Sequence, residues 1–338
     1  MSLLVLELSG LATFQDLGRM GFQKYGVSKG GAIDTYALAE GQAILNNDKN
    51  TAALELQHGG GKFKCLNTIW LATSGGTMEA SVSNNSIPWR TSFELKPDQI
   101  LTLEKRQSGV YSYLHMLGGI DCQKIMGSHS THVPSGLGEC PQSGTIINPK
   151  PTQVKINQPV YLEQPNYFNS KVIRILQSPQ SGYFNPKDIE SLETQLFTMT
   201  TQRDRMGARI NAENFRIQAK AGLTLLSDPI IEGDIQVPVN GIPTILLADC
   251  QPTGGYPRIA TVIQADLHKV GQLQPNESFR FKFVNRNEAI NELARFRKKI
   301  VDIPNQLKPY VRKIDTLPNL LEYNLISGVV GENDGELH

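Results

Sequence analysis

The sequence has few of the features that mark specialised classes of protein. Its 338 residues include only 4 cysteines, and aromatic residues make up 7%. Lysine and arginine number 33 against 32 for aspartate and glutamate, so a broad surface for binding nucleic acid is not expected. No apolar run approaches the ~18 residues that a membrane-spanning helix needs. Composition therefore excludes a membrane protein, a coiled coil, a disordered chain and a disulfide-stapled miniprotein.

The N-terminus predicts a strand rather than a secretion signal. It lacks basic residues, and Glu7 interrupts the apolar run from Leu3 to Leu8. The cysteines form no Cys-x-x-Cys pair, which in a chain of this size favours reduced thiols. We therefore expect a cytoplasmic protein.

What the sequence does contain is turns. It has 30 glycines and 19 prolines, spread along the chain, and short apolar runs between them predict many strands. These runs are Ile69–Ala72, Ile100–Leu103, Val110–Leu117, Val172–Leu176, Ile235–Val239, Thr244–Ala248 and Phe279–Phe283. Three helices are also expected: one from Asp34 to about Leu45, one capped by Asn185 with a stripe of Ile189, Leu192 and Leu196, and one over roughly Glu288–Val301.

Two segments of the chain repeat one pattern. Residues 95–98 (Leu-Lys-Pro-Asp) and 273–276 (Leu-Gln-Pro-Asn) each precede a pair of apolar residues at the same spacing. This repeat, together with the length of the chain, suggests two related β domains. The polar stretch 148–169, which contains four prolines, is the candidate linker. The prediction is a first domain over 1–165, a second over 170–301 and a C-terminal tail over 302–338.

The stretch 231–267 is the densest in polar groups near strand ends. Asp249, Gln251, Thr253 and Tyr256 cluster at one junction of strand and loop. Within the loop, adjacent glycines at 254 and 255 would let backbone N–H groups approach a ligand. From spacing alone, a tight turn whose glycines meet only a conformational need is an equal alternative.

Upstream of this loop, Arg205 and Arg209 stand four residues apart. They can reach one oxyanion if the segment is helical or turns back, since guanidinium groups suit carboxylate and phosphate. The alternative is a surface ion pair with Asp204.

A cluster of histidines and cysteines lies in the middle of the chain. His129, His132 and Cys140 could supply zinc ligands, but their spacing matches no standard zinc motif. Ordinary loop histidines and buried thiols are the favoured interpretation, and we predict no metal. The sequence also lacks a Walker motif, a dinucleotide-binding glycine motif and a serine-hydrolase elbow.

Several motifs, taken in order, resemble the Kip antagonist family, also called the allophanate hydrolase subunit 2 family. Its members include the C subunit of the bacterial ATP-dependent 5-oxoprolinase and half of the carboxyltransferase domain of urea carboxylase. The resemblance covers about residues 3–290. The motifs that carry it are 13–19 with Gly21, 26–34, 46–47, 53–55, 118–121, 127–131, 204–207, 233–238 and 248–257, followed by Gln272 and Pro275.

The resemblance implies a mainly β fold, with two cyclophilin-like β-barrel domains and a few short helices. It also implies two protein partners, a Kip-inhibitor-like B subunit and a lactam-hydrolysing A subunit. The complex would open the small molecule 5-oxoproline to glutamate, with ATP and Mg acting at the level of the complex. Phosphorylation of the lactam carbonyl would expose a resistant amide to water, and such a site needs donors facing an oxyanion and cations facing phosphate.

The resemblance also implies catalytic and substrate-binding roles for residues in these motifs. Arg205 and Arg209 would hold an anion, and Asp249 would act as an orienting or basic carboxylate, so these three are the predicted catalytic residues. The predicted substrate-binding residues are Gln236 and Tyr256 as hydrogen-bonding side chains, Gly254 and Gly255 as backbone donors, and Gln251 and Thr253 beside them.

Two other functions stay open within the family. One is half of a biotin-dependent carboxyltransferase acting on urea or a related amide, with biotin as cofactor. The other is a non-enzymatic antagonist that binds an inhibitor of a sensor kinase. The sequence departs from the family pattern at His129, at residues 136–141, and at Ser178, Asp234 and Pro252, which leaves the exact substrate open.

Overall fold

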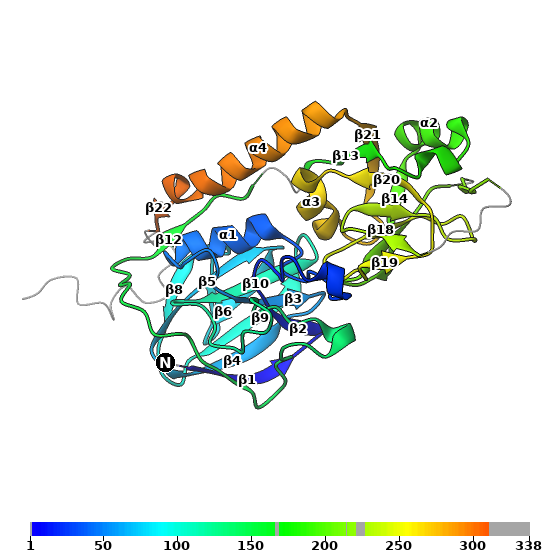
Figure 1. Cartoon of the computed structure of the whole chain (residues 1–338). Helices are drawn as coiled ribbons and strands as arrows, with labels where there is room; N and C mark the ends of the chain where they lie inside the picture. Colours follow the sequence, from blue (N-terminus) through cyan, green and yellow to red (C-terminus); the bar gives the residue numbers. More distant parts are fainter. Residues whose placement is uncertain (1, 166–168, 214, 221–226, 311–338) are drawn as a thin grey trace, which may run out of the picture.

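A computed structural model describes residues 2–165, 169–213, 215–220 and 227–310 of the chain. These residues form mostly β-structure, with four α-helices among them. Figure 1 shows two β-rich halves side by side, with helix α4 running along one side of both. The expected mainly β fold is confirmed.

The N-terminal half contains two antiparallel sheets. The larger has the strand order β11-β1-β4-β9-β6-β7, and the smaller has the order β2-β3-β10-β5-β8. Side chains from both sheets, such as Phe63 and Leu114, share one hydrophobic core. The strands are β1 Ser2–Leu8, β2 Leu11–Gln15, β3 Ala53–Gln57, β4 Gly61–Asn67, β5 Ile69–Gly75, β6 Met78–Val82, β7 Asn85–Ile87, β8 Ser92–Leu95, β9 Ile100–Arg106, β10 Tyr111–Met116 and β11 Ile146–Ile147.

The C-terminal half is a closed barrel in the order β13-β20-β17-β18-β15-β14-β21. Along β21, Phe279 and Phe281 are buried while Arg280 and Lys282 are exposed, as the period-2 pattern predicts. The barrel strands are β13 Val172–Gln177, β14 Phe197–Arg203, β15 Gly207–Asn211, β17 Asp234–Gln236, β18 Thr244–Leu246, β20 Arg258–Val262 and β21 Ser278–Phe283. A separate short ribbon pairs β16 Asp228–Pro229 with β19 Thr253–Gly254.

The three expected helices are present. Helix α1 (Thr35–Ile44) begins after Asp34, whose carboxylate accepts from the Ala37 amide at 2.9 Å. Helix α2 (Pro186–Thr194) buries Leu192, but Leu196 lies beyond its end and is half exposed, so the expected stripe is shorter. Helix α4 (Arg286–Asp302) begins with a capping box between Asn285 and Glu288. Helix α3 (Leu267–Gln272) was not expected, because six residues are too few for a visible period.

The repeated sequence pattern corresponds to a repeated turn. Asp98 and Asn276 both take left-handed backbone conformations, with φ of 64° and 68°. In each turn the next residue uses its side chain in the same way: Gln99 accepts from Lys96 N at 2.8 Å, and Glu277 accepts from Gln274 N at 2.9 Å. The two halves therefore share a local structure as well as a local sequence.

The two halves are joined by a buried polar contact. Gln272, at the end of α3, donates to the Asp34 carboxylate at 2.8 Å and accepts from the Val110 amide at 2.8 Å. Beside it, a Cβ on Gly271 would lie 2.4 Å from the Ile33 side chain, so only glycine permits this approach. The hydrophobic core of the barrel continues across this contact into α1 and β10.

Residues 303–310, the first part of the predicted tail, pack on the N-terminal half. Ile303 is buried, and β22 (Lys308–Pro309) pairs with β12 (Val160–Tyr161) from the predicted linker. The rest of the predicted tail, 311–338, lies outside the described residues, and the domain boundaries at 165 and 301 stay a prediction. No helix in the described ranges is long and apolar enough to cross a bilayer.

Candidate functional site

One cavity in the C-terminal half gathers all six predicted substrate-binding residues. Its volume is about 650 Å³, and it lies between strands β15, β17 and β18 and the loop that contains β19. The predicted residues that line it are Gln236, Gln251, Thr253, Gly254, Gly255 and Tyr256, together with Arg209. The structure thus brings together residues from 209 to 256 that sequence alone left unconnected in space.

Gln236 is the most distinctive residue of this cavity. Its side chain is 7% exposed, and its amide nitrogen Nε2 has no hydrogen-bond partner among the described residues. A Cβ on Gly254 would lie 2.7 Å from this nitrogen, so a glycine at 254 leaves room for the amide. A buried donor without a partner costs about 1–3 kcal/mol, which a ligand oxygen would recover. Gln236 therefore marks a place for a carbonyl or carboxylate oxygen.

Arg209 supplies a positive charge at the same cavity. Its guanidinium donates to the side-chain oxygen of Gln202, and within the described ranges no carboxylate pairs with it. The side chain is partly exposed, so the charge is available to an anion that enters the cavity.

Arg205 and Asp249, by contrast, do not line the cavity. Arg205 is 3% exposed, and it donates from Nε and Nη2 to the two carboxylate oxygens of Asp249, both at 2.9 Å. Its Nη1 pairs with Glu55, and Nη2 also donates to the Gly31 carbonyl at 2.7 Å. The structure therefore does not bring Arg205 and Arg209 to one anion, and both carboxylate oxygens of Asp249 are occupied.

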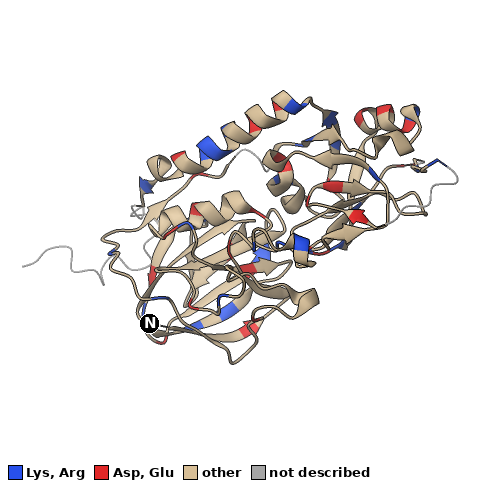
Figure 2. Cartoon of the chain, in the orientation of Figure 1, with Lys and Arg blue, Asp and Glu red and all other residues tan. Residues whose placement is uncertain are grey.

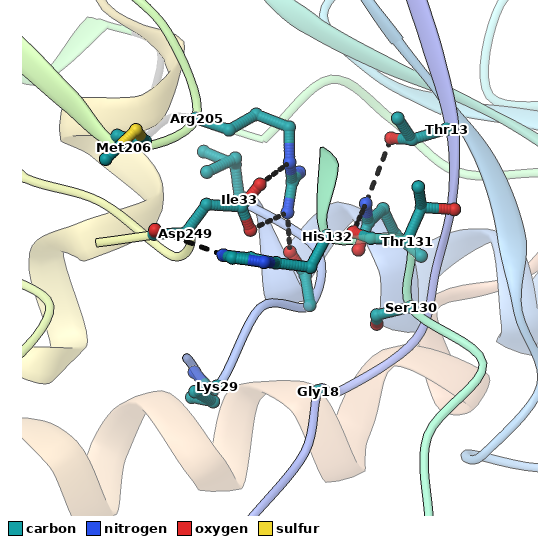
Figure 3. Close-up of polar contacts among 12 residues, drawn as sticks. Thr13, Gly18, Lys29, Ile33, Ser130, Thr131, His132, Arg205, Met206 and Asp249 are labelled. Atoms are coloured by element: carbon teal, nitrogen blue, oxygen red, sulfur yellow. Dashed lines mark hydrogen bonds and ion pairs between the residues drawn. The ribbon is translucent and has the colours of Figure 1, made fainter. Parts of the chain in front are cut away.

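Burial by itself disfavours the charge on Arg205. The carboxylates of Glu55 and Asp249 outweigh that penalty and raise the pKa of Arg205 above its usual value. Arg205 is therefore a permanent cation held between two buried anions. Figure 3 shows Arg205 reaching Asp249, with His132 approaching Asp249 as well.

The ion pair between Arg205 and Asp249 fixes two walls of the cavity. The Asp249 amide donates to the Arg205 carbonyl at 2.9 Å, and the Leu247 amide donates to the Met206 carbonyl at 3.0 Å. Met206 and the residues that follow Asp249, Cys250 and Gln251, line the cavity directly. The geometry makes Arg205 and Asp249 positioning residues behind the cavity.

Sequence reasoning assigned no role to Glu55, the third member of this network. Glu55 lies 1% exposed in β3 and accepts from the Tyr113 hydroxyl at 2.7 Å and from the Ile33 amide at 3.0 Å. The available signal was a single acidic residue flanked by Leu54 and Leu56 in a predicted strand, since a buried charge needs a partner.

The model of the carboxyltransferase domain family, subdomain A and B, matches residues 25–283 of this sequence. The chain belongs to this family. It is 31% identical to the 5-oxoprolinase C subunit of Haemophilus influenzae over 305 residues, which are 87% of this chain and 94% of the relative. It is also 31% identical to the 5-oxoprolinase C subunit of Escherichia coli, over 85% of this chain and 92% of the relative.

Longer proteins contain a similar region. The urea amidolyase of Saccharomyces cerevisiae is 27% identical over 78% of this chain, which is 16% of that protein. The crystal structure of the Kluyveromyces lactis urea amidolyase has a TM-score of 0.80 over 92% of this chain and 21% of that one. At 22% identity, this likeness shows the shared fold. The family resemblance predicted from the motifs is confirmed.

Two carboxyltransferase-family motifs, far apart in sequence, meet at Asp16. Its carboxylate accepts from the Ser128 hydroxyl at 2.6 Å, from the Ser130 hydroxyl at 2.5 Å, and from the amides of His129 at 2.7 Å and Gly18 at 2.8 Å. Burial pushes the pKa of Asp16 upward, but these hydrogen bonds outweigh burial and lower it. Asp16 is therefore ionised at neutral pH and holds the two motifs together.

Replacing Asp16 with asparagine is expected to lower the free energy of unfolding at pH 7 by about 1–3 kcal/mol. The folded pKa lies below the unfolded value of about 3.9, so the carboxylate contributes stability above that pH and loses it as the pH falls through the folded pKa. Urea denaturation across pH should show the difference between wild type and variant shrinking below about pH 4. A difference that stays constant down to about pH 2 would contradict this assignment.

Residues at which the sequence departs from the family pattern form defined hydrogen bonds in the structure. His129 bonds the Cys122 carbonyl at 2.8 Å and the Lys150 ammonium at 2.7 Å. His132 bonds the Ser135 hydroxyl at 2.6 Å. Within the described ranges, no three His, Cys, Asp or Glu residues lie close enough to hold a metal ion. These histidines thus serve as hydrogen-bonding groups of the loops.

In the barrel, Asp234 is 1% exposed. It accepts from the Thr261 hydroxyl at 2.6 Å and pairs with Arg258 at 3.3 Å, so it ties β17 to β20. Ser178 donates to the Arg258 carbonyl at 2.5 Å, and the Pro252 carbonyl accepts from the Ile230 amide at 3.0 Å. The side chains of Asp234 and Ser178 thus tie barrel strands together, whereas the bond at Pro252 is made by its backbone and does not depend on proline.

Proposed function

We propose that this chain is the C subunit of an ATP-dependent 5-oxoprolinase complex, which opens the cyclic amide of 5-oxoproline to glutamate. The observation that carries this proposal is the extent of the match. The chain aligns with 94% of the Haemophilus influenzae C subunit over 87% of its own length. The urea amidolyase of yeast, by contrast, is matched over only 16% of its length.

The chemistry of the cavity supports this substrate. 5-Oxoproline has a lactam carbonyl and a carboxylate, and the cavity offers an unpartnered amide donor at Gln236 and a guanidinium at Arg209. We assign the lactam oxygen to Gln236 and the substrate carboxylate to Arg209. Gly254 and Gly255 supply backbone near the same place, and Gln251, Thr253 and Tyr256 supply further polar groups.

Arg205 and Asp249 contribute to this function indirectly. Since both are buried in one ion pair behind the cavity, we assign them the positioning of the segments that carry Met206 and Gln251. A carboxylate whose two oxygens both accept from a guanidinium is a poor general base, because the ion pair stabilises its charged form.

ATP does not fit the glycine-rich loop before α1. The Asp34 carboxylate accepts from the Ala37 amide, and the Glu55 carboxylate accepts from the Ile33 amide. Two protein carboxylates thus already lie at this helix terminus, and their negative charge disfavours a phosphate there.

The test is reconstitution. The chain should be combined with purified candidates for a Kip-inhibitor-like B subunit and a lactam-hydrolysing A subunit, and glutamate release from 5-oxoproline measured with and without ATP. We expect release only when all three proteins and ATP are present. Full activity of the other two proteins without this chain would contradict the proposal.

The name of the family favours a second candidate, half of a biotin-dependent carboxyltransferase acting on urea or a related amide. The unpartnered Gln236 amide suits the ureido oxygen of biotin as well as a lactam oxygen. Supplying carboxylated biotin carrier and urea to the same preparation distinguishes the two: carboxyl transfer to urea without glutamate release would replace the first proposal with this one.

A further inference from the structure

A second cavity, outside the site described above, lies beneath helix α4. Its volume is about 630 Å³, and its walls come from α1, the short turn 264–266, α3, α4 and the strap that follows β12. Figure 1 shows α4 running alongside α1 at this place, and Figure 2 shows basic positions recurring along α4. The cavity therefore involves both halves of the chain, and none of its lining residues belongs to the cavity around Gln236.

One wall of this cavity is aromatic. The rings of His268 and Phe296 stack with centroids 4.8 Å apart, and the Tyr36 ring lies 6.1 Å from that of Phe296. All three residues line the cavity. Burial lowers the pKa of His268 to about 4 against the opposing charges of Asp34 and Asp266, so the imidazole is neutral at pH 7. The wall is thus an uncharged aromatic surface, suited to stacking against a planar ring.

The rest of the cavity lining carries a positive charge. The cations that line the cavity are Arg90, Arg174, Lys269, Arg295, Lys299 and Lys308, against three lining acids, Glu40, Glu163 and Glu292. Glu40 and Glu163 each pair with one of these cations, Glu292 pairs with Arg174 and Arg295, and Asp266 pairs with Arg174 and Lys269. Lys299 has no ion pair among the described residues and acts electrostatically on His268. A positive excess therefore remains beside the aromatic wall.

We propose that this cavity binds a nucleoside phosphate, with the base against the aromatic wall of Tyr36, His268 and Phe296 and the phosphates toward Lys299. Aromatic stacking on one side and cations on the other match the two chemical parts of such a ligand. A volume of about 630 Å³ lies within the range of small-molecule and cofactor sites. The inference does not rest on the proposed function, since binding is a property of the chain alone.

The test is calorimetric titration of the full chain with ATP. We expect saturable binding at one site, weakened about tenfold or more in Lys299→Glu. Lys298→Glu is the matched control, because Lys298 is the neighbouring exposed lysine on α4 and does not line the cavity. It should change the affinity less than about twofold, and all variants should melt at the wild-type temperature.

A second variant tests the aromatic wall. Phe296→Leu should weaken ATP binding about threefold or more while leaving the affinity for inorganic tripolyphosphate unchanged, because only ATP carries a ring. Absence of saturable ATP binding by the wild type would overturn the proposal. So would equal losses in Lys298→Glu and Lys299→Glu, or tripolyphosphate binding as tight as that of ATP. All of these measurements report binding and not turnover. A negative binding result is therefore distinct from a negative result in the assay of glutamate release by the reconstituted complex.

Discussion

Replacing Arg205 with methionine is expected to lower the free energy of unfolding by about 3–5 kcal/mol. The replacement leaves Glu55 and Asp249, each 1% exposed, as buried carboxylates without their counterion. It also removes the donor to the Gly31 carbonyl, so the N-terminal half and the barrel lose a direct bond. Urea denaturation followed by circular dichroism measures the change.

Arg209→Met is the matched control for this experiment. Arg209 is on the same strand–turn unit, is partly exposed and has no described ion pair, so its replacement should change stability by less than about 0.5 kcal/mol. The triple variant Arg205→Met, Glu55→Gln, Asp249→Asn should recover part of the loss, because it removes the buried charges together. A loss below about 1 kcal/mol in Arg205→Met alone would contradict the buried network.

Local chemistry made much of this fold predictable. Asp34 and Asn285 stand before apolar-periodic segments, and both helices begin where these residues predict. The turn after residues 95 and 273 was visible as a repeated pattern because its geometry depends on neighbouring residues alone. The polar loop 251–256 was also visible, since adjacent glycines and polar residues at a strand end are local features.

Pairing between distant residues was not predictable in the same way. Arg205 meets Glu55 across 150 positions and Asp249 across 44, and nothing in the local sequence selects these partners over Asp204 or a ligand. For this reason, the sequence suggested one shared anion for Arg205 and Arg209, whereas in the structure Arg205 pairs with Glu55 and Asp249. Likewise, the missing partner of Gln236 Nε2 is a property of the folded barrel, because it depends on the position of Gly254.

Replacing Gln236 with leucine is expected to reduce kcat/KM for 5-oxoproline about 100-fold or more in the reconstituted complex. The variant loses a preorganised donor to the lactam oxygen, whose negative charge grows when the amide is attacked. The free energy of unfolding should stay the same or increase. The replaced amide nitrogen has no partner among the described residues, so its burial is unfavourable in the wild type. Gln142→Leu, at an exposed position outside this cavity, is the control and should leave both quantities unchanged.

The most direct test of the cavity as the substrate site is this pair of measurements on one variant: kcat/KM in the complex and the free energy of unfolding of the chain. The prediction is a loss of about two orders of magnitude in kcat/KM, with unfolding free energy within about 0.5 kcal/mol of wild type or above it. A kcat/KM within about threefold of wild type in Gln236→Leu, at unchanged stability, would contradict the assignment of the cavity.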